Sequence, residues 1–400
     1  MTFFSSRHSG INNSAMPDSM PDSMPDSMPD SMPDSDQMVG VSQTLRAFLE
    51  LLEIGDFQER WDAAKRLPSY GWPALQGTLA LLRSHPEDDE LAWFAAQIIG
   101  QFPSEEALTV LVDLVTSATT DEDVKGMAAR TLANLGEAAI APLNQLLQEE
   151  RWRVLAIRTL AQIRHRDAME RVVEFWDDPD AEVRAQVLAV LTCDRHPRIL
   201  TPVLAGVTDL SAPVRRFATI ALGLQHGLIE ELAPEVDVVA LLRERLLDLD
   251  LAVSQQAAIA LSRLGTVEAI EALGRCLRSP HTPIPLKLEL VRALGWINHP
   301  RTIDDLAMAL SLPSSQVCLE AIRVLSQVSS PPLKAEAGQA LIRWWCSEPP
   351  HRELARVRQA IALGLGNFGQ PEAMAVVRSL LDDPDETVRW HAQAGSEAIG

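Results

Sequence analysis

The sequence predicts an all-α protein built as an α-solenoid, a right-handed superhelix of about eleven two-helix repeats after an N-terminal arm. Three observations lead to this prediction. One Tyr, nine Phe and nine Trp among 400 residues supply few of the aromatic side chains that favour strands. From Val41 onward, apolar residues recur at helical spacing and are interrupted at short, regular intervals by Pro, Gly, Asp or Ser. Similar segments also recur along the chain with the period typical of solenoids, roughly 20–50 residues.

Residues 1–40 form a separate region, an acidic arm. Residues 16–35 are five copies of Met-Pro-Asp-Ser, and a Pro at every fourth position is incompatible with a helix or a central strand. We expect the arm to be disordered and to contribute nothing to the core. The sequence leaves open whether it is a recognition tail or an expansion that is tolerated because nothing packs on it. The predicted solenoid spans residues 41–400.

The repeats are clearest in segments that begin with an acidic or polar turn. The segment DDPDAEVRAQVLAVL starts at Asp177, SAPVRRFATIALGL carries the Val equivalent to Val183 at position 214, and DDPDETVRWHAQAGSEAIG closes the sequence. Aligning all copies gives eleven anchor positions, which are Glu59, Leu91, Val124, Trp152, Val183, Val214, Val253, Leu286, Val317, Val357 and Val388. The two longest intervals indicate insertions at about 224–236 and 329–352, which we expect to form loops.

Each repeat is predicted to contain an outer helix, a turn and an inner helix. In the last repeat the outer helix begins near Pro371, and the inner helix is DETVRWHAQAG. Neither helix can bury its apolar stripe alone, so neighbouring repeats must stack. Asp or Ser near the start of the inner helix is expected to cap exposed backbone N–H groups. The predicted capping residues are Asp177, Asp180, Ser211 and Asp385.

The charge and the cysteine content limit the class of function. Thirty-five basic against 55 acidic residues give a net charge of −20, which disfavours binding to nucleic acid or anionic membranes. The four Cys, at positions 193, 276, 318 and 346, lack metal or redox spacing and suit a reducing cytoplasm. The N-terminus lacks a basic region followed by an apolar run, and no apolar stretch is long enough to span a membrane. We therefore expect a cytoplasmic protein that does not insert into membranes.

The repeat segments resemble a known family. Together with LGTVEAIEALGRCL and NFGQPEAMAVVRSLL, they are similar to the HEAT-like repeats of phycobilisome (phycobilin) lyase proteins over about residues 42–400. The shared features are an acidic-Pro-acidic turn, a Val-Arg pair and an Ala-rich inner helix. The resemblance implies a HEAT-like solenoid that attaches bilin to cyanobacterial antenna proteins or removes it, or that serves only as a scaffold. The same repeat serves unrelated roles, so the activity must be argued from the site.

Eight of the eleven residues that directly follow an anchor are basic. They are Arg60, Lys125, Arg153, Arg184, Arg215, Lys287, Arg358 and Arg389. One interpretation is a series of anion-binding sites. The resemblance implies another, in which each Arg pairs with a turn Asp of a neighbouring repeat, and bidentate geometry explains why Arg outnumbers Lys. We favour the second interpretation.

Positions two and six residues after the anchors are predicted to face the concave surface together. Two pairs of Arg lie there, on either side of an apolar stretch of Ala189, Ile220 and Ile259, and three Trp join them. Such side chains are enriched in interface hot spots, and Arg could hold carboxylates of an acidic partner or propionates of a bilin. Alternatively, the Trp side chains only pack between adjacent inner helices. The predicted partner-binding residues are Trp61, Trp93, Arg130, Arg158, Arg292, Arg323 and Trp390.

Signatures of catalysis are scarce. His165, His196 and His299 occupy the same place relative to their anchors and His226 lies one position earlier, but adjacent repeats stack about 9–10 Å apart. Zinc ligands lie about 2.0–2.1 Å from the ion, so we predict no metal site and expect these His to fill turns at helix C-termini. Cys193 and Cys318 are expected on inner helices as apolar filler, with a thiol role as the alternative. No His-Glu pair, G-x-S-x-G or Gly-rich phosphate loop is present.

The sequence thus predicts a non-catalytic protein-interaction scaffold or chaperone, which the resemblance links to phycobilisome antenna assembly or turnover. The alternative is a phycobilin lyase or lyase subunit, with bilin as a ligand and no resident cofactor. The predicted partner is a protein on the concave face, and the resemblance points to a phycobiliprotein. No polar helix follows the last inner helix, so we also expect a second copy or a partner to cover the C-terminal end.

Overall fold

The computed structural model describes residues 35–193, 195–368 and 370–397. These residues form 23 α-helices and five short 3-10 segments, and they contain no strand. The prediction of an all-α fold is confirmed. The predicted arm lies outside the described residues, except that its last six residues, 35–40, belong to helix α1. The predicted boundary at residue 40 therefore falls inside a helix.

The helices form two layers. The outer layer consists of α1 (Ser35–Ile54), α3 (Trp72–Ser84), α5 (Glu105–Thr116), α7 (Ile140–Leu146), α9 (Arg166–Val173), α11 (Leu200–Gly206), α14 (Val238–Arg245), α16 (Val267–Arg278), α18 (Pro300–Ala309), α20 (Pro331–Cys346) and α22 (Pro371–Ser379). The inner layer consists of α2 (Phe57–Arg66), α4 (Asp89–Ile99), α6 (Glu122–Asn134), α8 (Arg153–Ile163), α10 (Ala181–Leu191), α12 (Ala212–Leu224), α15 (Leu251–Leu264), α17 (Ile284–Trp296), α19 (Ser315–Ser326), α21 (Ala355–Leu365) and α23 (Glu386–Glu397). The connections contain α13 (His226–Leu232), η1 (Leu67–Tyr70), η2 (Gly136–Ala139), η3 (Glu150–Trp152), η4 (Pro197–Ile199) and η5 (Pro350–Glu353).

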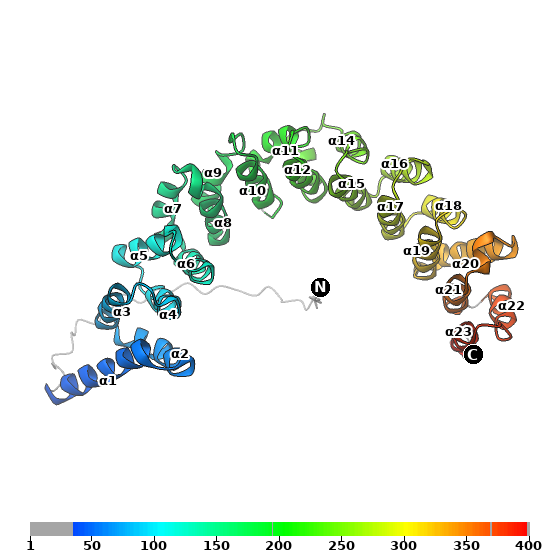
Figure 1. The fold of residues 1–400 in the computed structure, drawn as a ribbon. Coiled ribbons are helices and arrows are strands. Elements are labelled where there is room, and N and C mark those ends of the chain that lie inside the picture. Colours follow the sequence, from blue (N-terminus) through cyan, green and yellow to red (C-terminus); the bar gives the residue numbers. More distant parts are fainter. Residues whose placement is uncertain (1–34, 194, 369, 398–400) are drawn as a thin grey trace, which may run out of the picture.

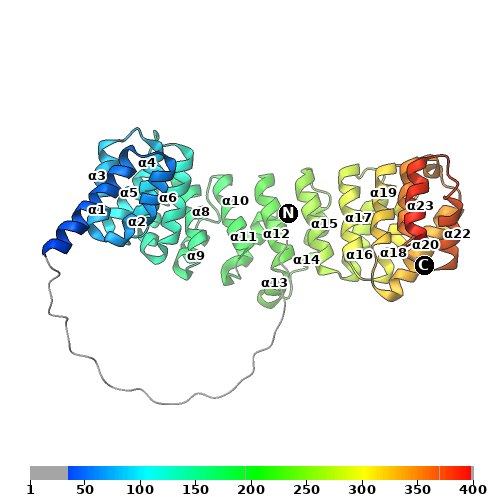
Figure 2. The same ribbon diagram turned by 90° about the horizontal axis from the view of Figure 1, so that it is seen from below.

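The two layers bend into an arc (Figure 1). The inner helices line its concave side, the outer helices its convex side, and α2 and α23 lie at opposite ends. Figure 2 shows the same arrangement from below as an elongated row of helix pairs. The strongest helix contacts join successive inner helices, such as α10 with α12 and α12 with α15. The predicted solenoid of eleven two-helix repeats is confirmed within the described residues.

The predicted anchors mark the starts of the inner helices. Ten of the eleven are the third residue of their helix, and Trp152 ends η3 directly before α8. The apolar anchors from Val183 to Val388 are at most 4% exposed. Asp180 and Asp385 cap their helices as expected, since each accepts a backbone N–H two residues later at 2.9 Å. The repeat register was therefore readable from the sequence.

Two of the four predicted caps are wrong. Ser211 occupies the N-cap of α12 but its side chain accepts no backbone N–H, and Pro213, two residues later, has no N–H to offer. The role expected of Asp177 belongs to Asp178. The carboxylate of Asp178 accepts the backbone N–H of Asp180 at 2.8 Å. The carboxylate that organises this turn therefore lies one residue later than expected.

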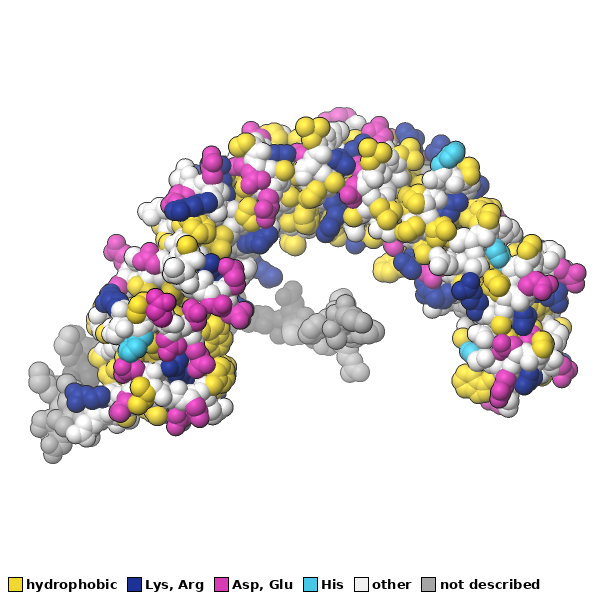
Figure 3. Space-filling model, in the orientation of Figure 1, with side chains coloured by type: hydrophobic (Ala, Val, Ile, Leu, Met, Phe, Trp, Pro, Cys, Tyr) yellow, Lys and Arg dark blue, Asp and Glu magenta, His cyan; other side chains and the backbone are white. Residues whose placement is uncertain are grey.

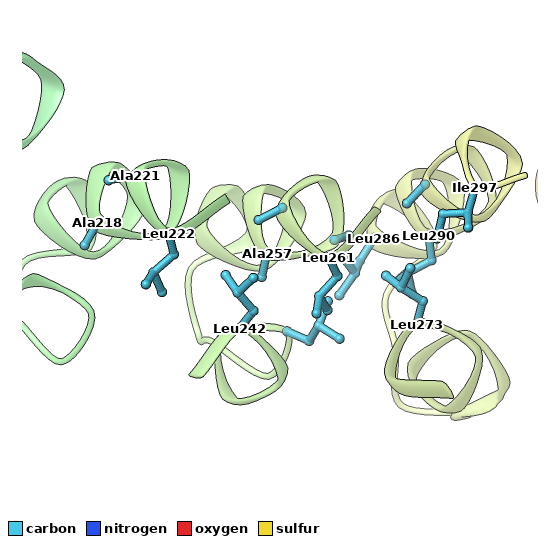
Figure 4. Close-up of a cluster of buried hydrophobic side chains, with 14 of the residues drawn as sticks. Ala218, Ala221, Leu222, Leu242, Ala257, Leu261, Leu273, Leu286, Leu290 and Ile297 are labelled. Atoms are coloured by element: carbon cyan, nitrogen blue, oxygen red, sulfur yellow. The ribbon is translucent and has the colours of Figure 1, made fainter. Parts of the chain in front are cut away.

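Small side chains allow the inner helices to approach closely. Gly223 of α12 faces Ala260 of α15, and a Cβ added at Gly223 would lie 2.6 Å from that of Ala260. Larger side chains fill the space between the layers, where Leu222 and Leu261 point toward the outer helices and meet residues such as Leu242 of α14 (Figure 4). One apolar cluster runs from repeat to repeat almost along the whole arc.

The two predicted insertions are helical, so the expectation of loops is wrong. The first contains the short helix α13, whose Ile229 is fully buried. The second extends the outer helix α20, which has 16 residues, and adds η5. Trp344 and Trp345 near the end of α20 are 6% and 3% exposed. Apolar burial explains why these segments are ordered as helices.

Candidate functional site

The Arg residues after the anchors form internal links between repeats. Arg184 donates from Nε and Nη2 to the carboxylate of Asp209 at 2.9 Å each, and from Nη1 to the carbonyl of Asp178 at 2.8 Å. Arg215 and Asp248 repeat the bidentate pair at 2.8 Å. The hydrogen bond from Arg215 lowers the pKa of the Asp248 carboxyl below its usual range, against the opposing effect of burial. The remaining links are Arg60 with Asp88, Arg153 with Asp178, and Arg358 with Asp383.

These contacts confirm the structural interpretation for five of the eight basic residues, whereas Arg389 donates to the backbone carbonyls of Asp383 and Pro384 instead. The charge of each linked Arg is neutralised by an internal carboxylate, so the column is not a series of anion-binding sites. The links are not continuous along the arc. Lys125 pairs with Glu122 of its own helix at 2.8 Å, and Ser254 and Cys318 replace the basic residue in two later repeats.

An aromatic cluster covers the inner helices at the N-terminal end of the arc. The rings of Trp61 and Trp93 stack with centroids 6.4 Å apart and planes 22° apart. Phe57 stacks on Trp61 at 6.3 Å, and Phe94 meets Trp93 edge-on at 5.1 Å. Phe57 is 56% exposed, whereas Phe94 is buried. Thus both predicted Trp belong to one cluster that packs partly between helices and partly presents rings to solvent.

The sequence analysis missed Phe57 and Phe94. Phe57 lies one helical turn before Trp61, and this i, i+4 spacing was the signal that could have revealed it. Phe94 is adjacent to Trp93 but points into the core, where Leu52 and Ile98 belong to the same apolar cluster. Only the packing of α4 against α2 shows that Phe57 lies on the exposed face of these helices and Phe94 on the buried face.

Arg130 faces acidic side chains. It lines a cavity of about 410 Å³ together with Phe57 and Trp93. Five carboxylates at the starts of α4 and α6 line the same cavity, which are Asp89, Glu90, Asp121, Glu122 and Asp123. Figure 3 shows acidic and apolar surface side by side at this end of the arc. Arg130 therefore belongs to a predominantly acidic surface.

Arg158 interacts with the next inner helix. Its Nε donates to Oε1 of Gln186 on α10 at 3.0 Å, and its Nη2 lies 3.7 Å from Glu182. Arg130 and Arg158 thus do not form an isolated cationic patch, because each is surrounded by acceptors of its own. Beyond them, the half-buried Ala189, Ile220 and Ile259 line the middle of the concave wall.

The second predicted pair is joined by a carboxylate. Arg292 and Arg323 both bond Glu320, at 2.7 and 2.6 Å to the same oxygen, and Arg323 adds a second bond at 3.0 Å. Hydrogen bonds from Arg323 and then Arg292 lower the pKa of Glu320, while its partial burial opposes them. Arg292 also pairs with Glu289 of its own helix at 3.3 Å, so the two guanidinium groups are balanced by two carboxylates. Glu320, three residues after its anchor, was not identified from the sequence.

Trp390 lies on α23 at the other end of the arc and is 65% exposed. It contacts the ring of His391 edge-on at 5.2 Å. The seven predicted site residues therefore belong to seven different inner helices, from α2 to α23. They are spread along the arc and do not converge on one reaction centre.

A further cleft of about 980 Å³ opens between the end of α8 and the turn after α10. Arg164, Arg166 and Arg195 line it, with Glu170 as an acidic neighbour. Cys193 also lines this cleft and is exposed, so the expectation that it fills an inner helix is wrong; it lies two residues beyond α10. Cys318 is fully buried, as expected of apolar filler, and burial raises its pKa to about 12.

The regular His residues have a structural role that differs from the expected one. Nδ1 of His165, His196 and His299 accepts a backbone N–H two residues later, at 3.3, 3.2 and 3.2 Å. They fill turns as predicted, but they cap the starts of outer segments, because the inner helices have already ended. The described part of the chain contains no group of His, Cys, Asp and Glu able to hold a metal ion. Nor does it contain a helix long and apolar enough to cross a membrane.

Comparison with known proteins agrees with this architecture. The profile of the family described as HEAT repeats matches residues 75–156, 197–285 and 351–395. The karyopherin Kap121p bound to Ste12p has a TM-score of 0.57 at 14% identity over 91% of this chain and 46% of its own. Kap121p bound to the extreme C-terminus of the protein phosphatase Cdc14p gives 0.56 at 14% identity, over 92% and 46%. An engineered protein aligns at 22% identity over 89% and 98%, with a TM-score of 0.37.

A search of curated proteins gave no significant match. The karyopherin comparisons concern the fold alone at this level of identity, and they cover less than half of the karyopherin. The family profile, in contrast, matches more than half of this chain. The chain belongs to the HEAT-repeat family.

Proposed function

We propose that this protein is a non-catalytic scaffold or chaperone whose concave wall binds a protein partner. The observation that carries the proposal is the exposure of large apolar side chains on the inner helices at the two ends of the arc. Phe57, Leu363 and Trp390 are 56%, 52% and 65% exposed. Such surfaces on a folded chain typically mark interaction sites. Of the partner-binding residues proposed from the sequence, Trp390 is one of these exposed side chains.

The proposed partner-binding set is Trp61, Trp93, Arg130, Arg158, Arg292, Arg323 and Trp390, with Phe57 added. The karyopherin, which shares the fold, is seen bound to the extreme C-terminus of another protein. This supports the idea that a solenoid of this shape can hold a polypeptide. We further propose that association through α23 covers the exposed Trp390, which light scattering of the wild type and of Trp390→Ser would test.

The test of the scaffold is affinity capture with matched variants. Wild-type protein and a variant with Arg292→Glu and Arg323→Glu are used as bait in a native lysate, and the captured proteins are identified by mass spectrometry. A specific partner lost by the variant supports the proposal, provided that circular dichroism shows the variant to be folded. Control bait with Arg83→Glu, on the outer helix α3, should retain the partner. The proposal is wrong if the concave variant captures the same proteins as the wild type.

We propose, from the resemblance of the repeats, that the partner belongs to the phycobilisome and that the protein acts in the cytoplasm. The four free thiols suit that compartment. Purified phycobiliprotein should then bind immobilised wild-type chain and be released by the Arg292 and Arg323 variant. Failure to bind, with the scaffold test positive, would restrict the proposal to another protein partner.

A second candidate, phycobilin lyase, is favoured by one observation, the cleft lined by Arg164, Arg166 and Arg195. Its volume of about 980 Å³ lies at the upper end of ligand pockets, about 300–1,000 Å³. Guanidinium groups there suit the propionates of a bilin. Co-expression with apo-phycobiliprotein and bilin tests this candidate. Covalently attached pigment that disappears in Arg164→Gln with Arg166→Gln would favour the lyase over the scaffold.

A further inference from the structure

We infer that the concave face of the first three repeats binds a protein segment rich in Arg or Lys, which differs from the acidic partner expected from the sequence. The inference rests on the proposed function, because it assumes that the concave wall holds a polypeptide. It concerns a surface that we call the aromatic–acidic groove. This groove is formed by Phe57, Trp61, Trp93 and the carboxylates that line the 410 Å³ cavity beside them.

The apolar part of the groove is a row of stacked rings. Phe57, Trp61 and Trp93 follow one another with centroid distances of 6.3 and 6.4 Å and interplanar angles of 18° and 22°. Their faces therefore have nearly the same orientation, although they come from two helices. The ammonium of Lys65 already lies 4.8 Å from the centroid of Trp61. The protein thus places a cation of its own against this row, which is the geometry of a cation–π contact.

The polar part of the groove is acidic. Five carboxylates and one guanidinium, that of Arg130, line the cavity. Some of the carboxylates have partners, since Glu122 binds Lys125 at 2.8 Å and Glu90 lies 3.5 Å from Arg60. Asp123 makes no side-chain hydrogen bond or ion pair within the described residues. The cavity therefore has a surplus of acceptors for a cation that the chain itself does not supply.

The charge of the surrounding sequence strengthens this surplus. Residues 42–149 contain seventeen Asp and Glu against seven Lys and Arg, whereas residues 150–400 contain 32 against 27. The acidic excess is therefore concentrated in the repeats that carry the groove. A field of this sign attracts basic segments and repels acidic ones. The chain's own N-terminus has the wrong charge to occupy the groove, because residues 1–34 contain five Asp and one Arg.

The chemistry of Arg and Lys matches both parts of the groove. Their aliphatic stems can lie against the rings while the cationic head reaches the carboxylates. An acidic segment would instead bring like charges together, and a purely apolar one would leave the carboxylates desolvated. The occupant is therefore a basic segment, with apolar residues between its cations.

The test uses the full chain and a fluorescently labelled dodecapeptide with three Gly-Arg-Leu-Arg units, followed by anisotropy. A matched peptide with Glu in place of Arg is the charge control. We expect the basic peptide to bind, the Glu peptide not to bind, and Phe57→Ala to weaken binding at least fivefold. The variant with Asp89→Asn and Asp123→Asn should weaken binding at least tenfold. Its control, with Asp113→Asn and Glu137→Gln, loses the same charge outside the groove and should change binding less than twofold.

Equal weakening by both charge variants would show that only the bulk charge attracts the peptide, and it would overturn the inference. Binding of the Glu peptide with equal affinity would also overturn it. The capture experiment separates this inference from the scaffold proposal. If the groove variant retains a partner that the Arg292 and Arg323 variant loses, the groove is not the binding site although the scaffold stands. Circular dichroism and the melting temperature of each variant verify folding.

Discussion

Helices α8 to α15 and helices α15 to α19 belong to the same solenoid, but different interactions hold them together. Between α8 and α15, Arg153, Arg184 and Arg215 each bind an Asp in the turn of the next repeat, at 2.8 to 2.9 Å. In the following repeats, Ser254 and Cys318 occupy the equivalent positions and are buried.

In this second region no Arg follows the anchors, and the ion pairs lie elsewhere on the helices. Arg292 of the inner helix α17 pairs with Glu320 of α19 at 2.7 Å. Arg278 of α16 pairs with Asp305 of α18. The same backbone arrangement is thus compatible with either link. Shape complementarity of small and branched side chains is common to both regions, and the ion pairs add to it locally.

The largest expected effect is the loss of a link between inner helices. Replacement of Arg215 by Ala leaves the Asp248 carboxylate, only 4% exposed, without its bidentate partner. We expect a loss of about 3 kcal/mol in the free energy of unfolding, as for other broken buried pairs. The equivalent change Ser254→Ala in the second region should cost less than about 1 kcal/mol, because Ser254 donates only to a carbonyl of its own helix. Urea unfolding of both variants measures the two losses in free energy of unfolding. Equal losses would show that the Arg–Asp link does not stabilise the first region more than Ser254 stabilises the second.

The next effect concerns the close contact between α12 and α15, where the two regions meet. A Cβ at Gly223 would lie 2.6 and 2.9 Å from Cβ and Cα of Ala260, so Gly223→Ala forces the helices apart. We expect a loss of about 1–3 kcal/mol, typical of overpacking. Gly126→Ala in α6 is the control, because no atom lies within 4 Å of its Cβ and Ala favours a helix by up to about 1 kcal/mol. Opposite shifts of the melting temperature are expected, and a stabilised Gly223 variant would contradict this view of the contact.

The regions should also differ in their response to acid. The hydrogen bond from Arg215 lowers the pKa of Asp248 in the folded chain, so its contribution is present above the unfolded pKa and is lost as the pH falls through the folded pKa. Burial raises the pKa of Asp305, against Arg278, so its contribution is present at low pH and is lost as the pH rises through the folded pKa. Compared with the wild type, Asp248→Asn should lose less stability on acidification and Asp305→Asn should lose more. Urea unfolding at several pH values measures how the free energy of unfolding depends on pH. The two variants should change this dependence in opposite directions.

The smallest effect is chemical rather than energetic. Cys193, near the first region, and Cys346 are exposed and should react with a water-soluble disulfide reagent in the folded chain. Cys276 and Cys318 are 7% and 0% exposed, and burial raises the pKa of both thiols. Two rapidly reacting thiols are expected at pH about 8, against four in denaturant. Cys193→Ser should remove one of them without changing the melting temperature, and rapid reaction of Cys318 would show that α19 opens.

Local chemistry explains which features the sequence could predict. The anchors, the turns and the Arg–Asp links recur with the repeat, so a single residue such as Val183 defines the register of its helix and of Arg184 beside it. The surroundings of Arg130 could not be predicted in this way, because they depend on how the start of α4 meets the start of α6. The sharing of Glu320 by two Arg likewise depends on the spacing of α17 and α19. Sequence periodicity identifies which residues face inward, but only the packing between repeats determines their neighbours.

The curvature of the arc depends on the angle between each repeat and the next, which the Arg–Asp links help to fix. Each link fixes the rotation of one repeat relative to the next, and these rotations add along the chain. A small change of angle where α12 meets α15 therefore moves the ends, with Trp61 and Trp390, through a much larger distance. The span between the two ends is set by contacts in the middle, where neither of these side chains lies. A partner that pulls on both ends of the arc would therefore strain the contact between Gly223 and Ala260 in the middle.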